Sequence, residues 1–201
     1  MTQPHPDWND SYTRAESAPW DIGRPQPVFT RLADDGLLAG RVLDAGCGTG
    51  EQTILAAKSG ADATGVDIAP DAIRKARAKA EARGARARFE VADILSLPTL
   101  GQRFDVVIDS GLFHVFGDDD RAKYVASLGS VLDPGGTCYL MCFSDRQPGD
   151  FGPRRVRQQE IRDAFAGGWS VSRIEAAEFD IHPMLGSDKA RAWLATIVRT
   201  G

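Results

Sequence analysis

The segment Val42–Gly50 constrains the fold of this chain more than any other stretch. It reads V-L-D-A-G-C-G-T-G, an apolar run that ends at an aspartate and is followed by three alternating glycines. A helical pattern begins directly after it. This order of features predicts a buried strand, a tight turn and a helix whose N-terminus faces a ligand. Glycine is needed because the backbone bends sharply and a ligand must approach it without interference from Cβ atoms.

The spacing of the glycines discriminates between ligands. Dinucleotide-binding turns follow the pattern G-x-G-x-x-G, whose last glycine allows close packing of helix and strand. Here the glycines are Gly46, Gly48 and Gly50, and Glu51 stands where the last glycine of that pattern would be. Asp44 also argues against a pyrophosphate, because its carboxylate would lie near the phosphates. A cationic ligand suits that carboxylate better.

The letters D-A-G-C-G-T-G resemble the first motif of the class I S-adenosylmethionine-dependent methyltransferases, whose cofactor carries an ammonium and a sulfonium. The resemblance implies that the turn, including Cys47, wraps the methionine part of the cofactor. It also implies one Rossmann-like α/β domain with a seven-stranded, mostly parallel sheet that ends in an antiparallel hairpin. We expect an N-terminal helical lid over residues 1–40 and the methyltransferase core over residues 41–201.

Acidic residues follow the next two predicted strands. The short apolar segment Ala61–Val66 ends at Asp67, which can accept hydrogen bonds from both ribose hydroxyls. The family resemblance implies that Ile68 lies against the adenine. It also implies that Asp93 accepts a hydrogen bond from the adenine amino group, while the backbone of Ile94 reads the ring. The alternative is that Asp93 is only a loop residue.

The near-continuous apolar segment Phe104–Asp109 predicts a strand in the middle of a parallel sheet. It delivers the next residues to the carboxyl edge, where open α/β folds bind ligands. We expect Asp109 and Ser110 to contact the cofactor and Phe113 to contact the methyl acceptor. His114 is the candidate general base, because a neutral histidine can take a proton near pH 7. The alternative is a histidine packed between phenylalanines that only shapes the acceptor pocket.

The segment Trp8–Phe29, through the letters P-W-D-I-G-R, resembles the N-terminal segment of the thiopurine and thiol/halide methyltransferases. In those enzymes this segment caps the cofactor and helps to shape the acceptor pocket. The resemblance places Trp20 over the cofactor, where a ring face favours a cation. It places Trp8, Tyr12 and Arg24 at the acceptor. Alternatively, the aromatic residues only pack this segment onto the domain.

The segment Gly152–Val156 is similar to the one that follows the fifth strand of the thiol/halide methyltransferases. In that family a proline there precedes an aromatic residue that contacts the acceptor, but here Arg154 stands at the aromatic position. This departure argues against a halide or thiocyanate acceptor. A guanidinium can orient an anionic or carbonyl-bearing acceptor, such as a deprotonated hydroxyl on a heteroaromatic ring. The alternative is a surface arginine before a helix.

Simpler patterns predict the remaining elements. Expected helices are 51–59, 70–83, 118–132 and 156–165, and Pro27 can begin another. The segment 86–91, whose charged residues alternate, is expected to be an edge strand. The expected closing strands are 169–179 and 192–198, joined by the loop 180–187, which carries His182. The basic residues of the second helix, Arg74, Lys75, Arg77, Lys79 and Arg83, are expected to form a solvated face. The three cysteines, Cys47, Cys138 and Cys142, contain no C-x-x-C pattern and are expected to be buried thiols.

Composition limits the partners. The chain has 201 residues and a formal net charge of −4, which provides no basic surface for nucleic acid or an anionic membrane. No apolar run approaches the ~20 residues of a membrane helix, and the N-terminus lacks the regions of a signal peptide. We expect a cytoplasmic protein that binds a small molecule and neither nucleic acid nor membrane. The oligomeric state stays open.

Together these motifs predict methyl transfer from S-adenosylmethionine to an oxygen, sulfur or nitrogen of a small aromatic or heteroaromatic acceptor, with S-adenosylhomocysteine as the product. Such a transfer is an in-line displacement with a neutral leaving group, so the protein must chiefly align the reacting atoms and exclude water. A base is needed only for a protonated acceptor, and the spacing of the histidines suggests no metal site. The alternatives are a thiol or metalloid methyltransferase of the thiopurine type, and a non-catalytic domain that binds S-adenosylmethionine.

Overall fold

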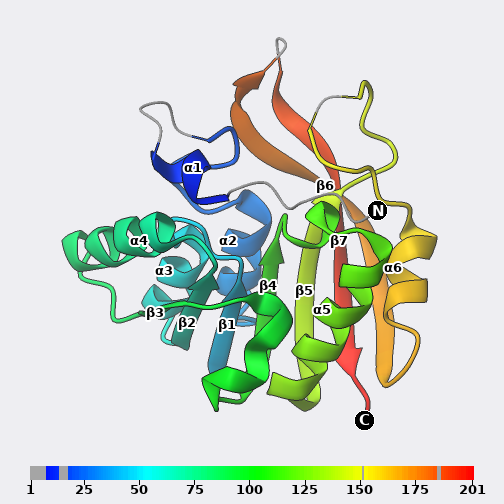
Figure 1. Ribbon diagram of the computed structural model, residues 1–201, viewed down its shortest axis with the longest axis horizontal. Helices are drawn as coiled ribbons and strands as arrows, with labels where there is room; N and C mark the ends of the chain where they lie inside the picture. The colour runs from blue at the N-terminus through cyan, green and yellow to red at the C-terminus, as the bar shows by residue number, and fades with distance from the viewer. Residues whose placement is uncertain (1–7, 14–17, 151, 185–186) are drawn as a thin grey trace.

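A single seven-stranded sheet runs through the described residues, which are 8–13, 18–150, 152–184 and 187–201 of this computed structural model. The strand order is β3-β2-β1-β4-β5-β7-β6. Strands β1 to β5 are parallel, and β7 runs antiparallel to β5 and β6. The strands are β1 (Arg41–Ala45), β2 (Asp62–Asp67), β3 (Arg88–Val91), β4 (Phe104–Ser110), β5 (Leu132–Phe143), β6 (Trp169–Met184) and β7 (Ser187–Arg199). This topology confirms the predicted α/β fold with its closing antiparallel hairpin (Figure 1).

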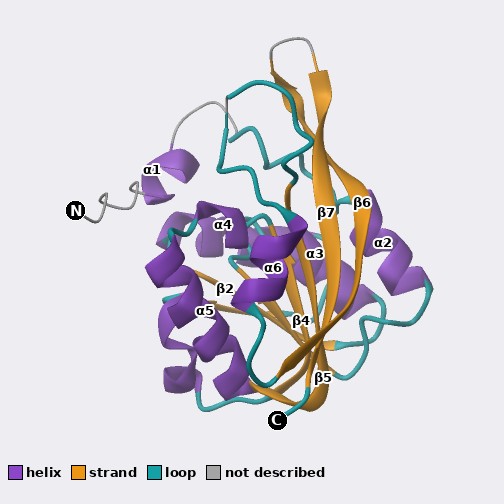
Figure 2. Ribbon diagram, turned by 90° about the vertical axis from the view of Figure 1, so that its right-hand side faces the viewer, coloured by secondary structure: helices purple, strands orange, loops and turns teal. Residues whose placement is uncertain are grey.

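Helices cover both faces of the sheet (Figure 2). They are α1 (Trp8–Thr13), α2 (Pro27–Asp34), α3 (Glu51–Lys58), α4 (Pro70–Ala82), α5 (Asp118–Val131) and α6 (Gln158–Ala164), with two 3₁₀ helices, η1 (Ile94–Leu100) and η2 (Phe113–Val115). Val42 and Val106 pack with α2 and α3, whereas Leu43 and Val107 pack with α5 and α6. Because alternate residues of each central strand enter opposite apolar layers, these strands form continuous apolar runs in the sequence. Within the described ranges, no helix has both the length and the apolar character needed to cross a membrane.

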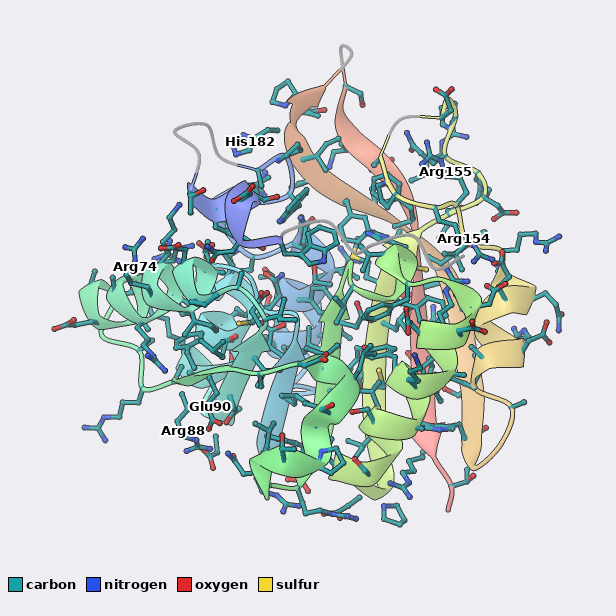
Figure 3. The ribbon with its side chains drawn as sticks, viewed as in Figure 1. Arg74, Arg88, Glu90, Arg154, Arg155 and His182 are labelled. Carbon is teal, nitrogen blue, oxygen red and sulfur yellow. The ribbon has the colours of Figure 1, made fainter. Side chains whose placement is uncertain are left out.

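The strand β3 lies at the edge of the sheet, as its alternating charged residues predict. Arg88 forms an ion pair with Asp62 of β2, with 2.7 Å between Nη2 and Oδ1. Figure 3 shows Arg88 and Glu90 at this outer edge of the molecule. Charged side chains of this kind discourage the pairing of an exposed strand with another chain.

The C-terminal hairpin is longer than the sequence predicts. We expected a loop over residues 180–187, but β6 continues to Met184 and β7 begins at Ser187. Figure 1 shows the upper part of this hairpin rising beyond the rest of the sheet. Polar residues in this part are typical of a loop, yet here the cross-strand pair Asp180 and Lys189 forms an ion pair of 2.7 Å.

The extended hairpin also fastens the N-terminal segment. The side chain of Gln26 is buried and makes two hydrogen bonds of 2.8 Å with the backbone of Asp180, one to its carbonyl and one from its N–H. The backbone N–H of His182 donates to the carbonyl of Pro19 at 2.8 Å. These partners are more than 150 residues apart in the chain, so a local sequence pattern cannot predict them.

Part of the basic cluster on α4 is not the solvated face that we predicted. Lys79 and Arg83 form ion pairs of 2.6 and 2.7 Å with Glu51, the buried first residue of α3. Arg74 does lie on the outer side of α4 in Figure 3, where it pairs with Asp71. The correction follows from packing, because the last turns of α4 lie against the beginning of α3 and cover the Glu51 carboxylate.

All three cysteines are buried as free thiols, as predicted. Burial raises the pKa of Cys47, Cys138 and Cys142, and the thiolate is the reactive form. We therefore expect no reaction with Ellman's reagent in the native protein and reaction of all three thiols after unfolding in guanidinium chloride. A thiol that reacts at once in the native protein would contradict this packing.

Candidate functional site

Three buried carboxylates meet at the carboxyl edge of the sheet. Asp44 lies on β1, Asp67 ends β2, and Asp109 lies near the end of β4. Strands β2 and β4 flank β1 on either side. Their exposed fractions are 1%, 9% and 0%. Over the part of the chain that the structure describes, none of the three pairs with a basic side chain. Burying several acids together without a cation is costly, so this arrangement suits a cationic ligand.

Asp44 carries the strongest signature of such a site. Burial raises its pKa to about 7, and the nearby charges of Asp67 and Asp109 contribute in the same direction. Hydrogen bonds from the side chain and the backbone of Thr53 oppose this shift in pKa, and the hydroxyl donates to Oδ2 of Asp44 at 2.6 Å. An ionised carboxylate in this position gains more from a cation than an exposed one does.

Asp67 organises the glycine turn. Its Oδ2 accepts from the backbone N–H of Gly48 at 2.8 Å and its Oδ1 from that of Ala69 at 2.9 Å. Each carboxylate oxygen has a second lone pair, so both can still receive the hydroxyls of a ribose. The neighbouring Ile68 has 54% of its surface exposed, which leaves an apolar surface beside the carboxylate.

The carboxylate of Asp109 makes internal hydrogen bonds, and the expected contact of this residue with the cofactor stays a prediction. Its Oδ1 accepts from the backbone N–H of Leu112 at 2.7 Å, and its Oδ2 accepts from the hydroxyl of Tyr124 at 2.8 Å and the N–H of Phe113 at 3.1 Å. Burial raises its pKa to about 6. The carboxylate turns the chain after β4, and only the backbone there and the half-buried Ser110 remain available to a ligand.

The N-terminal segment lies directly on the glycine turn. A Cβ atom at Gly48 would be 2.9 Å from the hydroxyl oxygen of Tyr12, and that hydroxyl accepts from the indole N–H of Trp20 at 3.2 Å. Trp8 packs edge-on against Trp20 with ring centroids 6.1 Å apart. Tyr12 thus lies on the glycine turn, and Trp20 and Trp8 pack beside it through these contacts. Both the predicted lid and the alternative of simple packing are compatible with this arrangement. Residues 1–7 and 14–17 of the predicted lid lie outside the described residues.

Two further threonine contacts tie the turn to its surroundings. Thr49 donates to Oδ1 of Asp21 at 2.7 Å and accepts from Nζ of Lys79 at 2.7 Å. The side chain of Cys47 faces β2, since a Cβ atom at Gly65 would be 2.9 Å from its sulfur. Cys47 can therefore contribute to a ligand only through its backbone.

An aromatic cluster missed in the sequence surrounds His114. Its ring lies 5.1 Å from that of Phe143 and 6.0 Å from that of Phe179, and those two phenylalanine rings are 5.7 Å apart. Phe143 ends β5, so the rule that strand ends carry ligand contacts could have found it. Phe179 lies on the antiparallel β6, and only the sheet order brings it to this edge.

Phe113 belongs to the core, which corrects its expected role at the acceptor. It is fully buried, and its ring lies 6.4 Å from that of Tyr124 and 6.1 Å from that of Phe165. The guanidinium carbon of Arg121 lies 4.4 Å from the centre of the same ring. The hydrogen bond that its backbone N–H donates to Asp109 turns this residue inward, and the next residue, His114, faces the edge instead.

The two arginines predicted at the acceptor are also engaged elsewhere. Arg24 pairs with Asp180 at 2.6 Å and so helps to fasten the N-terminal segment to the hairpin. Arg154 pairs with Asp118, at the start of α5, and with Glu160 of α6. Figure 3 shows Arg154 beside α6, on the opposite side of the molecule from α4. Each guanidinium meets a carboxylate of this chain, which offsets its charge. The predicted contacts of these arginines with the acceptor stay predictions.

The predicted adenine contacts lie beyond β3. Asp93 is exposed and caps η1, since its Oδ1 accepts from the backbone N–H of Leu95 at 2.9 Å. The Oδ2 atom accepts no hydrogen bond within the described residues. The side chain of Ile94 is buried in the core, so this residue can meet a ligand only through its backbone.

The fold and these carboxylates define a class of protein: a Rossmann-like domain whose glycine turn and strand ends form a site for a cationic nucleoside. Comparison with known proteins identifies the family. The family of methyltransferase domains matches residues 42–136. The chain is 37% identical over 166 residues to the 2-heptyl-1-hydroxyquinolin-4(1H)-one methyltransferase of Mycobacteroides abscessus. The aligned region covers 81% of this chain and 73% of that enzyme.

Two other similarities extend over most of the chain. A probable thiol methyltransferase of Arabidopsis thaliana is 26% identical over 92% of this chain and 83% of its own length. A solved structure from work on the conversion of a disulfide bond into a thioacetal group during echinomycin biosynthesis has 38% identity and a TM-score of 0.83, covering 91% of this chain and 86% of that one.

The chain belongs to the S-adenosylmethionine-dependent methyltransferases. It is an enzyme that methylates a small molecule with S-adenosylmethionine as the cofactor, and solved structures of the same fold contain this cofactor or its product.

Proposed function

We propose that the acceptor is a flat, hydroxyl-bearing heteroaromatic molecule that is methylated on oxygen. The observation that carries this proposal is the aromatic cluster of His114, Phe143 and Phe179 at the carboxyl edge. Aromatic side chains bind flat rings by offset or edge-on stacking. The 37% identity to a hydroxyquinolinone methyltransferase supports the same class of acceptor. The 26% identity to a probable thiol methyltransferase makes a thiol the second candidate.

For the cofactor, we propose one role for each strand end. Asp44 faces the cationic methionine part, Asp67 receives the ribose hydroxyls, and Asp93 accepts from the adenine amino group, with Ile68 against the ring. Trp20, 46% exposed above the turn, covers the cofactor. The uncompensated charge of the buried Asp44 supports the first assignment, and the remaining lone pairs of Asp67 support the second.

When bound, S-adenosylmethionine supplies an electrophilic methyl group on a positively charged sulfur. The residues of this chain hold the acceptor in line with it and keep water out. The N-terminal segment suits the second task, because Tyr12 already lies on the turn and the buried Gln26 holds the segment against the hairpin. We propose that residues 1–40 form a lid of the same single domain.

We also propose that the enzyme acts in the cytoplasm and without nucleic acid. The net charge of −4 disfavours a polyanionic partner, and a small acceptor needs no appended recognition domain.

The test is release of S-adenosylhomocysteine with a panel of hydroxyquinolines, phenols, thiols and aromatic amines. We expect the largest kcat/KM for hydroxyl-bearing heteroaromatic acceptors, about fivefold or more above simple thiols, because one extra ring contact contributes about 1 kcal/mol. Calorimetry with S-adenosylmethionine alone is the control. A preference for thiols would favour the second candidate. Binding without any turnover would favour a non-catalytic domain.

A further inference from the structure

The hydrogen bond at His114 determines which nitrogen of its ring carries the proton. The backbone N–H of Phe143 donates to Nδ1 of His114 at 2.9 Å. This N–H is available because β4 has already ended, its last paired residue being Ser110 opposite Met141. A neutral imidazole that accepts at Nδ1 carries its proton on Nε2. The ring therefore has no lone pair left for a proton of the acceptor.

The other ring nitrogen points to the ligand edge. Across the described ranges, Nε2 of His114 makes no hydrogen bond, and this atom is not completely buried. It lies beside Gly111, where a Cβ atom would be 3.5 Å away. The rings of Phe143 and Phe179 hold the imidazole edge-on from two sides. The side chain thus presents one fixed N–H donor at the end of β4.

Two arginines act on the charge of His114. Arg121 of α5 and Arg155 of the segment after β5 are the charged groups that act on it, and burial together with these two cations lowers its pKa to about 3. Arg121 is itself buried and lies over the ring of Phe113, and the guanidinium carbon of Arg155 lies 5.4 Å from the centre of the Phe143 ring. The ring thus stays neutral at physiological pH. Arg121 is itself paired with Glu160, at 3.1 Å between Nη1 and Oε1, which offsets part of its charge.

We propose that His114 is a hydrogen-bond donor to an acceptor that arrives already ionised, rather than the general base that its position in the sequence suggests. This inference rests on the proposed function. In the transfer, a lone pair of the acceptor oxygen forms the new C–O bond, and the electron pair of the breaking C–S bond stays on sulfur. No proton moves in the site. The substrates are therefore heteroaromatic hydroxyl compounds, or their tautomers, that are acidic enough to ionise in neutral solution.

The first test is the pH dependence of kcat/KM for a series of hydroxylated heteroaromatic acceptors that differ in their own pKa. We expect the midpoint of each profile to follow the pKa of the acceptor, because the ionised fraction in solution limits the rate. A midpoint that stays at one pH across the series would reveal a base on the enzyme and overturn the inference. Absence of turnover with every member would instead count against the proposed function.

The second test compares His114→Gln with His114→Phe. Glutamine supplies an N–H donor near the same place, and phenylalanine fills the space without one. We expect His114→Phe to lower kcat/KM by about 10- to 100-fold, the usual worth of a hydrogen bond to a charged group, and His114→Gln to recover most of it. The affinity for S-adenosylmethionine, measured by calorimetry, checks that both variants are folded. Equal activity of the wild type and His114→Phe would overturn the inference.

Discussion

Replacement of Asp44 with Asn is expected to weaken the binding of S-adenosylmethionine by about 10- to 100-fold, because a charge-assisted contact contributes about 1.5–3 kcal/mol. Asparagine has nearly the same shape and still accepts the hydrogen bond from Thr53, so the loss reports the charge. Calorimetry measures the effect. Asp62→Asn is the matched control, since Asp62 lies exposed at the opposite end of β2. Equal affinity of the wild type and Asp44→Asn would exclude a direct role of this charge.

Asp44 also makes the affinity for S-adenosylmethionine depend on pH. The pKa of Asp44 is raised to about 7 in the folded protein, and a cationic ligand prefers the ionised carboxylate. The affinity of the wild type should therefore rise between pH 6 and pH 8, whereas the affinity of Asp44→Asn should not.

Without the cofactor, the ionisation of Asp44 at higher pH lowers the stability of the folded protein. The folded state holds this proton more tightly than the unfolded state, whose carboxyl has its ordinary pKa near 3.8. Stability contributed by the protonated form is thus present below about pH 4 and is lost as the pH rises to about 7. At pH 8 we expect Asp44→Asn to be more stable than the wild type by up to about 4 kcal/mol.

Gly50→Ala is expected to have the largest effect on the fold itself. Gly50 has φ of +84°, and a Cβ atom there would lie 2.7 Å from the ring of Phe89 and 2.9 Å from Cβ of Ala76. The left-handed backbone costs an alanine about 1–2 kcal/mol, and overpacking adds roughly 1–3 kcal/mol. The expected loss of about 2–5 kcal/mol is a large part of the free energy of unfolding of a typical domain, about 5–15 kcal/mol.

Gly84→Ala separates these two costs. Gly84 also has a positive φ, +62°, but a Cβ atom there would meet nothing within 4 Å. We expect Gly84→Ala to lower the free energy of unfolding by only the backbone cost of about 1–2 kcal/mol. Urea unfolding measures this loss, and the m-value should stay unchanged. Losses of equal size in the two variants would show that the contact of Gly50 with Phe89 and Ala76 is unimportant.

The residues that local patterns predicted correctly owe their position to their neighbours in sequence. The glycine turn follows from the positive φ of Gly46, Gly48 and Gly50, a conformation that glycine adopts without strain. Pro27 and Pro70 begin helices because their rings fix φ and their missing N–H needs no partner there. These causes act within a few residues, so the sequence alone is sufficient to identify them.

The interactions that local patterns did not predict depend on distant partners. Arg24 meets Asp180, and Arg154 meets Asp118 and Glu160, so guanidinium groups expected at the acceptor are engaged by carboxylates of this chain. Asp109 has the strand-end position typical of a ligand contact, but internal donors take up its carboxylate. A residue type indicates which bonds it can make, and only the packed chain determines which partner takes them.

By itself, the sequence determined the methyl donor and the sheet, because the glycine turn and the acids at the strand ends are local features with a chemical meaning of their own. Only the tertiary structure decided how the acceptor site is built. Phe143 and Phe179 come together because β7 is inserted between β5 and β6, and the proton of His114 lies on Nε2 because β4 ends before the N–H of Phe143. Both depend on strand pairing between distant segments, which no local pattern encodes.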